Sequence, residues 1–397
     1  MFKDSYFSAL KSIFIEQITP ILKTLETYND DELFFRHCHE RKYDNDTILV
    51  KYIKTFGIDT LNRRNLLHPQ ILKKNGLVRL EEDFLFECHN HPKTKNVILV
   101  KHNRYSPVFE HSHDSFETIF VFSGYCSNTI QGKRIKMSQG QLCFIPPNVS
   151  HTLEVFSDSI IINIIIRKST FDEIFFNLLT ANDILSKFFL GNLFFVKPIE
   201  YLIFDIGSDP ELIEILFSLL IEQSRKERLS DRIMDNHIYL FFLLLLRKYG
   251  NRYIAYENSG AKKERYWDII SYIYKNFRIV TLSKIADHFN ISLAYCSRLI
   301  ESITNKNFTT LVRDIRMKHA QVILVSSSAR IYDISYTLGY ENQETFIRTF
   351  KKYYGLTPAQ YRQKYTSETE NKADVFSPDI FILKGDLDAM LNTQTSR

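Results

Sequence analysis

The sequence is poor in cysteine and has none of the spacings that give cysteine a structural role. Five cysteines occur in 397 residues, an odd number, and no two of them are separated by two residues; they are Cys38, Cys88, Cys126, Cys143 and Cys296. Secreted domains that depend on disulfides usually carry an even, regularly spaced set. The cysteine pattern therefore argues against a disulfide framework and favours a protein of the reducing cytoplasm.

Long apolar runs are also missing. The longest, YLFFLLLL at 239–246, has eight residues, whereas a membrane-spanning helix needs about 20. The first residues, MFKDSYFSALKSIF, carry charges where a secretory signal requires an apolar core. We therefore expect no membrane segment and a cytoplasmic location.

The net charge is small, but it is unevenly distributed. The net charge is +5 for the whole chain, yet residues 261–366 contain 17 Lys and Arg against 8 Asp and Glu, a net charge of +9. Residues 1–260 are close to neutral, and the remaining C-terminal residues are acidic. A basic excess confined to about 100 residues is typical of a nucleic-acid-binding domain.

The N-terminal region, residues 1–95, favours helices by its apolar spacing, and we assign it no role. The first helix is expected to end at Pro20. Two short motifs, HCH at 37–39 and CHNH at 88–91, contain metal-binding residue types. Their spacing matches no common zinc module, so we interpret them as surface and core residues.

Residues 96–168 change to β-branched runs with period two, such as FETIFVFSG and SIIINIII. Turn residues separate the runs, as at Gln131–Gly132. This pattern predicts a barrel or sandwich of short antiparallel strands.

Residues 169–251 favour helices again. Asp209–Pro210 is a good helix start, and apolar residues follow at helical spacing. A second helix, nearly all apolar, ends at Gly250. The apolar surface of these two helices is larger than one small domain can cover. We therefore predict a homodimer through residues 209–250.

The C-terminal segment carries two helix-turn-helix patterns, at 281–304 and 331–354. In the second, Gly339 ends one helix and Asn342 begins the next. Phe346 and Phe350 have the inward spacing, followed by Tyr353 and Tyr354. The outward positions carry amide, carboxylate, hydroxyl and guanidinium side chains, which can read base edges in a major groove: Gln343, Glu344, Thr345 and Arg348.

The first pattern begins at Thr281 and turns at Asn290–Ile291, and Ser292 begins its second helix. Tyr295, Leu299 and Ile300 occupy its apolar positions, and Ala294, Ser297 and Arg298 its outward ones. One helix, 308–326, joins the two patterns. Because a single helix-turn-helix pattern gives many false matches, the pair in this spacing is the more specific signal.

Residues 266–365 resemble the AraC/XylS family of bacterial transcription regulators. The resemblance rests on TLSKIADHFNIS, RMKHAQVIL and IYDISYTLGYENQETFIRTFKKYYGLTPAQYR. It implies base contacts by Ala294, Ser297, Arg298, Gln343, Glu344, Thr345 and Arg348. Ala294 and Ser297 are short, so the first helix is expected to read DNA mainly through Arg298. Lys351 and Lys352 are expected to contact phosphates.

The strand-rich region contains a second constellation of functional residue types. His111, His113 and Glu117 fall on one face if their strand is continuous, and His151 follows after a turn. The spacing resembles that of metal-binding cupins, with Gly124, Gly140 and Pro146 in place and Asn148 where a glycine is usual. Three interpretations stay open: a divalent transition metal site, a pocket for a small effector, or a structural cluster.

We therefore predict a multidomain α+β protein: a cupin-like β-barrel sensor with flanking helices, followed by an all-α domain of two helix-turn-helix units joined by a linker helix. The expected divisions are 1–95, 96–168, a helical dimerisation segment 169–251, a polar linker 252–265, the DNA-binding domain 266–365, and an acidic, poorly ordered tail 366–397.

The predicted function is sequence-specific binding of promoter DNA, controlled by a small-molecule effector in the cupin-like domain, without enzymatic activity. RNA polymerase is a further candidate partner. The alternatives are a metal-dependent cupin enzyme fused to a DNA-binding domain and a non-specific DNA-coating protein. The basic segment and paired helices argue against the first, and the outward Gln and Glu argue against the second.

Overall fold

The computed structural model describes residues 12–57, 78–80, 86, 96–167, 185, 188–189, 192, 201–225, 227–256 and 264–370. The chain divides into two compact units. The first comprises Met1–Lys275 and Thr281–Leu311, and the second comprises Asn276–Val280 and Val312–Arg397. The barrel and the first helix-turn-helix belong to the first unit, and the second helix-turn-helix belongs to the second.

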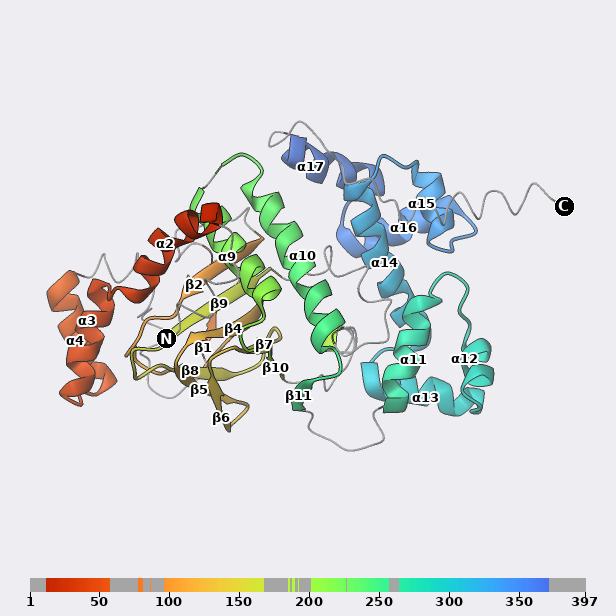
Figure 1. The fold of residues 1–397 in the computed structure, drawn as a ribbon. Helices are drawn as coiled ribbons and strands as arrows, with labels where there is room; N and C mark the ends of the chain where they lie inside the picture. The colour runs from red at the N-terminus through yellow and green to blue at the C-terminus, as the bar shows by residue number, and fades with distance from the viewer. Residues whose placement is uncertain are drawn as a thin grey trace. The chain divides into compact units, whose positions relative to one another are not determined.

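Two sheets form the barrel that the period-two pattern predicted (Figure 1). The five-stranded sheet contains, in spatial order, β1 (Val78–Leu80), β3 (His111–His113), β8 (His151–Glu154), β5 (Tyr125–Ile130) and β6 (Lys133–Ser138). The six-stranded sheet contains β11 (Tyr253–Tyr256), β10 (Tyr201–Asp205), β7 (Gln141–Ile145), β4 (Phe116–Ser123), β9 (Ile160–Ile166) and β2 (Val97–Lys101). All paired strands are antiparallel except β1 and β3.

Successive residues of the central strands point alternately into the barrel and outward. Inward residues such as Ile119, Cys143 and Ile161 form the barrel core. Outward aromatic residues pack against two helices, α9 (Pro210–Arg225) and α10 (Ser230–Tyr249), which lie against the six-stranded sheet in Figure 1. The ring centroids of Phe122 and Phe217 are 5.8 Å apart, and those of Phe144 and Phe242 are 5.4 Å apart.

Three strands lie in ranges that were expected to be helical or to be a linker. β10 falls within 169–251, β11 within 252–265, and β1 within 1–95. β10 pairs with β7, Leu202 opposite Phe144, and its first four residues are all buried. A strand buried on both faces shows no alternation of polar and apolar residues, so its sequence resembles a buried helix.

The hairpin between β5 and β6 has the turn that its sequence predicted. Gln131 and Gly132 both have positive φ, +49° and +77°. This geometry matches a two-residue type I′ turn, which fits the right-handed twist of the strands it joins. The turn sets the pairing of Ile130 with Lys133 and, through it, the register of the whole hairpin.

The N-terminal region supplies three helices beside the barrel (Figure 1): α2 (Ser12–Glu26), α3 (Asp30–Glu40) and α4 (Asn45–Phe56). The expectation that the first helix ends at Pro20 was wrong, because Pro20 lies inside α2. Asn29 begins α3 with a capping box that includes Glu32. Phe35, Cys38, Ile48 and Tyr52 form a small core between α3 and α4.

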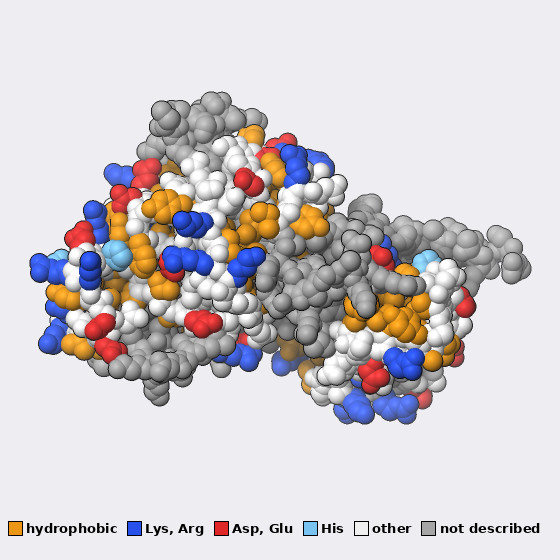
Figure 2. Space-filling model, turned by 90° about the horizontal axis from the view of Figure 1, so that it is seen from below, with side chains coloured by type: hydrophobic (Ala, Val, Ile, Leu, Met, Phe, Trp, Pro, Cys, Tyr) orange, Lys and Arg blue, Asp and Glu red, His pale blue; other side chains and the backbone are white. Residues whose placement is uncertain are grey.

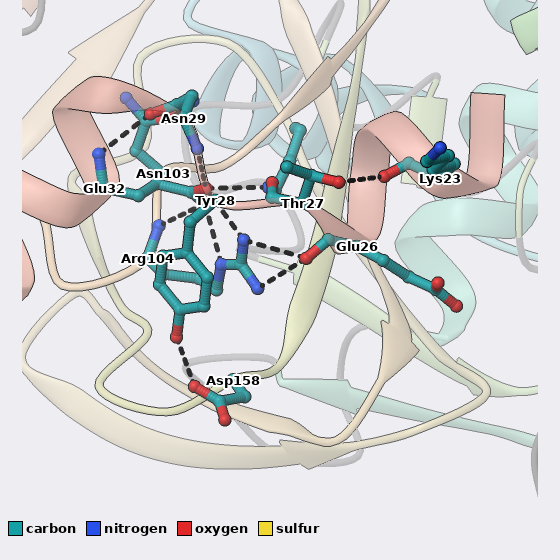
Figure 3. Close-up of polar contacts among 10 residues, drawn as sticks. Lys23, Glu26, Thr27, Tyr28, Asn29, Glu32, Asn103, Arg104 and Asp158 are labelled. Carbon is teal, nitrogen blue, oxygen red and sulfur yellow. Dashed lines mark hydrogen bonds and ion pairs between the residues drawn. The ribbon is translucent and has the colours of Figure 1, made fainter. Parts of the chain in front are cut away.

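A buried ion pair joins α3 to the barrel (Figure 3). The Arg104 guanidinium donates to both carboxylate oxygens of Glu32, at 2.9 and 2.8 Å, and Lys101 donates to Glu32 at 2.9 Å. The side chains of Glu32 and Arg104 are 0% and 2% exposed. Arg104 also donates to the Glu26 carbonyl and lies 3.6 Å from the centroid of the Tyr28 ring, whose hydroxyl bonds to Asp158.

The remaining helices are α11 (Glu264–Lys275), α12 (Leu282–His288), α13 (Leu293–Thr304), α14 (Phe308–Ser326), α15 (Ile331–Thr337), α16 (Gln343–Tyr354) and α17 (Pro358–Glu370). Both helix-turn-helix units and the helix between them therefore lie where the sequence predicted. α17 continues five residues into the range assigned to the tail, and residues 371–397 lie outside the described part of the chain. Within that part, no helix is long and apolar enough to cross a bilayer.

We expect Glu32→Gln to destabilise the protein, because it leaves the Arg104 charge buried without its partner. Breaking a buried pair in this way costs about 3–5 kcal/mol of unfolding free energy. Burial opposes ionisation of Glu32, but hydrogen bonds from Arg104 and Lys101 outweigh it and lower the pKa of Glu32. The pair thus stabilises the folded state above the unfolded-state pKa of about 4.3, and this contribution is lost as pH falls through the folded-state pKa.

Denaturant titration at several pH values measures both effects. The wild type should lose stability more steeply than Glu32→Gln as the pH falls below about 4. Glu40→Gln is the matched control, because Glu40 pairs with Arg36 on the exposed face of α3 and should matter little. Equal stability of wild type and Glu32→Gln at neutral pH would contradict the role of this ion pair.

Candidate functional site

The first helix-turn-helix has the capping that its sequence predicted. Thr281 accepts a hydrogen bond from the Lys284 amide before α12, and Ser292 accepts one from the Tyr295 amide before α13, both at 3.2 Å. Asn290 lies in the turn with a positive φ of +51°. Both helices therefore begin where the sequence placed them, and α13 presents a defined outer face.

On α13, Ala294 and Arg298 are exposed and Ser297 is half-buried. The expectation that Tyr295 takes an inward position was wrong, because its side chain is 43% exposed. Cys296 fills the inward position instead, with Leu299 and Ile300. Tyr295 lies three residues before Arg298, and residues three apart share a helix face. This spacing could have shown that Tyr295 is exposed. Tyr295 is therefore a candidate contact residue that the sequence reasoning missed.

The second helix-turn-helix turns at Gly339, which has a φ of +80°. A Cβ at this position would lie 2.3 Å from the carbonyl oxygen of Arg278, so a larger residue would collide with backbone. Arg316 donates to the carbonyls of Phe277 and Arg278, at 3.1 and 2.9 Å, and holds this segment in place. Asn342 then caps α16 by accepting from the Glu344 amide at 2.7 Å.

α16 has one buried and one exposed face, as predicted. Phe346 and Phe350 are fully buried in a core with Ile334 and Leu338. The candidate DNA-contacting residues lie outside this core: Glu344, Thr345, Arg348, Lys351 and Lys352 are exposed, and Gln343 is half-buried. Of the two tyrosines expected to face inward, Tyr354 is half-buried and bonds to Met317 and Gln321, whereas Tyr353 is 42% exposed.

On the face that Figure 2 shows, Lys and Arg side chains lie among Asp and Glu side chains, also at the edges. This view therefore does not single out one surface that would attract a polyanion.

The barrel brings together all four residues of the second constellation. His111 and His113 lie on β3, Glu117 lies on β4 and His151 lies on β8. The assumption of one continuous strand was wrong: the chain breaks at 114–115 and passes from the five-stranded to the six-stranded sheet. The histidines and Glu117 therefore meet across the barrel interior, not along one strand.

The four side chains surround a common centre. The Nε2 atoms of His113 and His151 lie 3.0 and 2.9 Å from Oε2 of Glu117. One potential ligand atom from each of the four residues can be chosen so that all lie within 4.8 Å of one another. Except for the half-buried His111, these residues are buried. Among the described residues this is the one such group that the structure brings together.

The hydrogen bonds of the rings determine what the centre can hold. Nδ1 of His113 faces the Ser115 carbonyl at 2.8 Å, and Nδ1 of His151 faces the Val149 carbonyl at 3.1 Å. Carbonyl oxygens only accept, so Nδ1 of each ring carries a proton and Nε2 of a neutral ring presents a lone pair to Glu117. Two lone pairs facing a carboxylate require a cation between them, either a proton or a metal ion.

The electrostatic environment also favours a cation at this centre. Burial opposes ionisation of Glu117, but hydrogen bonds from His113 and His151 outweigh it and hold the pKa of Glu117 well below its usual value. Burial disfavours the charged form of His113, but Glu117 outweighs it and raises the pKa of His113. Burial and the neighbouring His151 hold the pKa of His111 well below its usual value. Glu117 is therefore anionic, and His111 is neutral and able to donate a lone pair.

Among the described residues, the HCH motif at 37–39 forms no such centre. Its Cys38 is fully buried in the core of α3 and α4, while His37 and His39 are exposed. The interpretation of HCH as core and surface residues is confirmed. The CHNH motif at 88–91 lies outside the described residues.

The fold and the two sites define a protein in which a cupin-type barrel is joined to a pair of helix-turn-helix units. Comparison with known families agrees: the profile described as "Cupin domain" matches residues 96–162, and the one described as "Helix-turn-helix domain" matches residues 285–364. Residues 285–364 therefore carry a helix-turn-helix domain of the AraC type, and residues 96–162 carry a cupin domain.

Individual transcription regulators are similar to parts of this chain. The uncharacterized HTH-type transcriptional regulator YdiP of Escherichia coli (strain K12) is 26% identical over 163 residues, 40% of this chain and 54% of YdiP. This chain thus spans about half the length of that relative. The HTH-type transcriptional activator RhaS of Yersinia pestis bv. Antiqua (strain Angola) is 21% identical over 256 residues, 64% of this chain and 89% of RhaS.

Among solved structures, the C-terminal domain of AraT, a response regulator from Geobacillus stearothermophilus, is 34% identical. The match covers 26% of this chain and 86% of that domain, with a TM-score of 0.25.

Proposed function

We propose that this protein is a sequence-specific DNA-binding transcription regulator whose affinity for DNA depends on a small molecule bound in the barrel. The observation that carries the proposal is the outer face of α16. Its aromatic residues Phe346 and Phe350 are buried in the core, whereas Glu344, Thr345 and Arg348 are exposed and can contact another molecule. Such side chains near a helix N-terminus read base edges in a major groove.

The control of DNA binding follows from linkage. A molecule that binds one arrangement of the protein more tightly shifts the population toward it, by at most its difference in affinity for the two arrangements. The barrel and the second helix-turn-helix belong to separate compact units, which allows such alternative arrangements. RNA polymerase is a candidate partner of the DNA-bound form.

A cupin enzyme fused to a DNA-binding domain is the alternative function, and the buried centre around Glu117 is the observation that favours it. An enzyme of this kind does not require that the exposed face of α16 reads bases. Selection of randomised DNA by the full-length protein separates the two functions. Enrichment of one sequence supports the regulator, whereas turnover of a small molecule by the metal-loaded protein without such enrichment supports the alternative.

We expect Arg348→Ala to weaken binding to the selected DNA by about 1–3 kcal/mol and to relax selectivity at one base pair. Arg348 is exposed one turn into α16, where a side chain reaches the bases. Fluorescence anisotropy at fixed salt, on selected and scrambled DNA, measures the effect. Lys352→Ala is the control and should weaken both complexes alike, because a phosphate contact is independent of sequence. An equal loss on both DNAs for Arg348→Ala would show that it also contacts only phosphate.

We further propose that the protein dimerises through α10 alone. The expectation that the whole segment 209–250 forms the interface needs narrowing, because the apolar stripe of α9 is buried within this chain. α10 keeps an exposed stripe with alternating spacing of three and four residues: Ile233, Asn236, Leu240, Leu243 and Arg247. This is the spacing of the contact positions of a coiled coil, so a second copy of α10 is its best partner.

Sedimentation of the double variant Leu240→Glu/Leu243→Glu tests this interface. Leu240 and Leu243 are 44% and 37% exposed in the chain, so glutamate disturbs no core but places like charges at the centre of the paired stripes. The wild type should sediment as a dimer at micromolar concentration and the variant as a monomer. Leu33→Glu, on the exposed face of α3, is the control and should stay dimeric. A monomeric wild type would rule out the dimer.

Finally, we propose that the four-residue centre of the barrel holds a divalent transition metal ion. Each of His113 and His151 bonds through Nδ1 to a backbone carbonyl, the arrangement that orients the Nε2 atom of ligating histidines. Ligand atoms about 2.1 Å from an ion are at most about 4.2 Å apart, so the observed 4.8 Å limit requires only small side-chain movements. When bound, such an ion would act as a Lewis acid toward an oxygen of a bound molecule.

Metal analysis of the purified protein tests this proposal. After loading with Zn²⁺, Mn²⁺ or Ni²⁺ and removal of free metal, the wild type should retain about one ion per chain, and His151→Gln should lose it. His37→Gln is the control, because His37 is exposed on α3 outside the barrel. Metal content that is the same in wild type and His151→Gln would contradict the site.

A further inference from the structure

The first turn of α13 exposes three successive apolar side chains. Leu293 is 53% exposed and Tyr295 is 43% exposed, and Ala294 between them is exposed as well. The buried face of the helix is formed by other residues: Cys296, Leu299 and Ile300. Leu293 and Tyr295 therefore add little to the core, and much of their apolar surface faces water in this chain.

These three side chains lie at the end of the helix that is expected to meet the bases. Ser292 caps α13 by accepting a hydrogen bond from the Tyr295 amide, so residues 293–295 form the first helical turn. Side chains of a helix lean toward its N-terminus, which carries those of the first turn past the helix start. In a helix-turn-helix, the N-terminal residues of the second helix contact base edges in the major groove. The matched helix-turn-helix domain, residues 285–364, includes α13.

The chemistry of this turn differs from that of the first turn of α16. There the side chains of Gln343, Glu344 and Thr345 offer amide, carboxylate and hydroxyl groups for hydrogen bonds. In the first turn of α13, the Tyr295 hydroxyl is the one hydrogen-bonding group of the side chains, and the other two side chains are aliphatic. The two helices are therefore suited to different features of the bases.

The major groove presents one apolar group among its hydrogen-bonding atoms, the C5-methyl group of thymine. An apolar side chain gains by covering this methyl group, but it leaves a donor or an acceptor without a partner when it covers another base edge. The exposed leucine, alanine and tyrosine of α13 therefore favour thymine at the base pairs they cover. Arg298 is exposed one turn later and can bond to a neighbouring guanine or phosphate.

We propose that α13 selects thymine through apolar contacts of Leu293, Ala294 and Tyr295 with the methyl group of the base. This selectivity rests on the proposed function, because it names the base that the first helix-turn-helix recognises. Arg298, which was expected to carry the recognition by this helix, then supplements the apolar contacts. Covering one methyl group should favour thymine over uracil, which lacks it, about fourfold, which corresponds to about 0.8 kcal/mol.

Single replacements of thymine by uracil, in the DNA sequence that the full-length protein selects, test the proposal. Uracil keeps the hydrogen-bonding atoms of thymine and lacks only its methyl group. At one or more positions, the replacement should weaken wild-type binding about fourfold in fluorescence anisotropy at fixed salt. The same replacement should hardly change the affinity of the double variant Leu293→Ala/Tyr295→Ala, which lacks the large apolar side chains. Both residues are exposed, so the double variant keeps its core.

Two further variants separate apolar contact from other causes of a preference for thymine. Tyr295→Phe keeps the ring but loses the hydroxyl, and it should discriminate between thymine and uracil as the wild type does. Gln343→Ala is the matched control in the first turn of α16. It should weaken binding overall but keep the full discrimination at the thymines to which the double variant is insensitive.

Three results would overturn the proposal. They are the absence of any thymine whose replacement weakens wild-type binding, an equal loss in the double variant at every sensitive thymine, and a loss of discrimination in Tyr295→Phe. The first result would indicate that the exposed turn of α13 serves a protein partner instead of DNA.

The selection step separates these failures from failure of the proposed function. A wild type that selects no DNA sequence would contradict both the regulator and the thymine contact. Sequence-specific binding without the expected uracil effects would leave the regulator intact and reject only the role of Leu293 and Tyr295.

Discussion

The register of β4 against its two neighbours determines what the interior of the barrel contains. Glu117 pairs with Ile145 on one side and with Ile165 on the other, which directs its carboxylate inward. A shift of one residue would turn Glu117 toward the helices and bring Thr118 into the barrel. The imidazoles of His113 and His151 would then lose the carboxylate that both contact. The outward packing of Phe122 on α9 depends on the same register.

A second constraint acts on the helix-turn-helix of the C-terminal unit. The close approach of Gly339 to the Arg278 carbonyl allows the turn between α15 and α16 to pack against the segment 276–280. Phe346 and Phe350 pack the buried face of α16 into the core. Arg316 donates hydrogen bonds to the backbone segment that Gly339 contacts. The outer face of α16 is therefore presented by a rigid support, as a surface that reads a fixed DNA groove requires.

The two sites differ in how they use polar groups. On α16 the polar side chains are exposed and cost little while unbound. In the barrel, Glu117, His113 and His151 are buried, so each needs a partner of matching character. Glu32 and Arg104 meet the same requirement with each other, and they thereby tie the N-terminal helices to the barrel. Buried polar groups thus have two roles in this part of the protein. They form the proposed site inside the barrel, and they attach α3 to the barrel.

The sequence alone determined the features that depend on local pattern. Helix starts at Thr281, Ser292 and Asn342 followed from capping residues, and the turn at Gln131–Gly132 followed from its residue types. Candidate site residues also followed, because period two and helical spacing decide which side chains share a face.

Only the tertiary structure decided features that depend on distant partners. β10 is a strand because β7 offers it an unpaired edge, a fact that its own buried residues do not encode. Tyr295 is exposed because Cys296 takes the inward position. The break at 114–115 carries the chain between sheets, so His113 and Glu117 meet across the interior instead of along one strand.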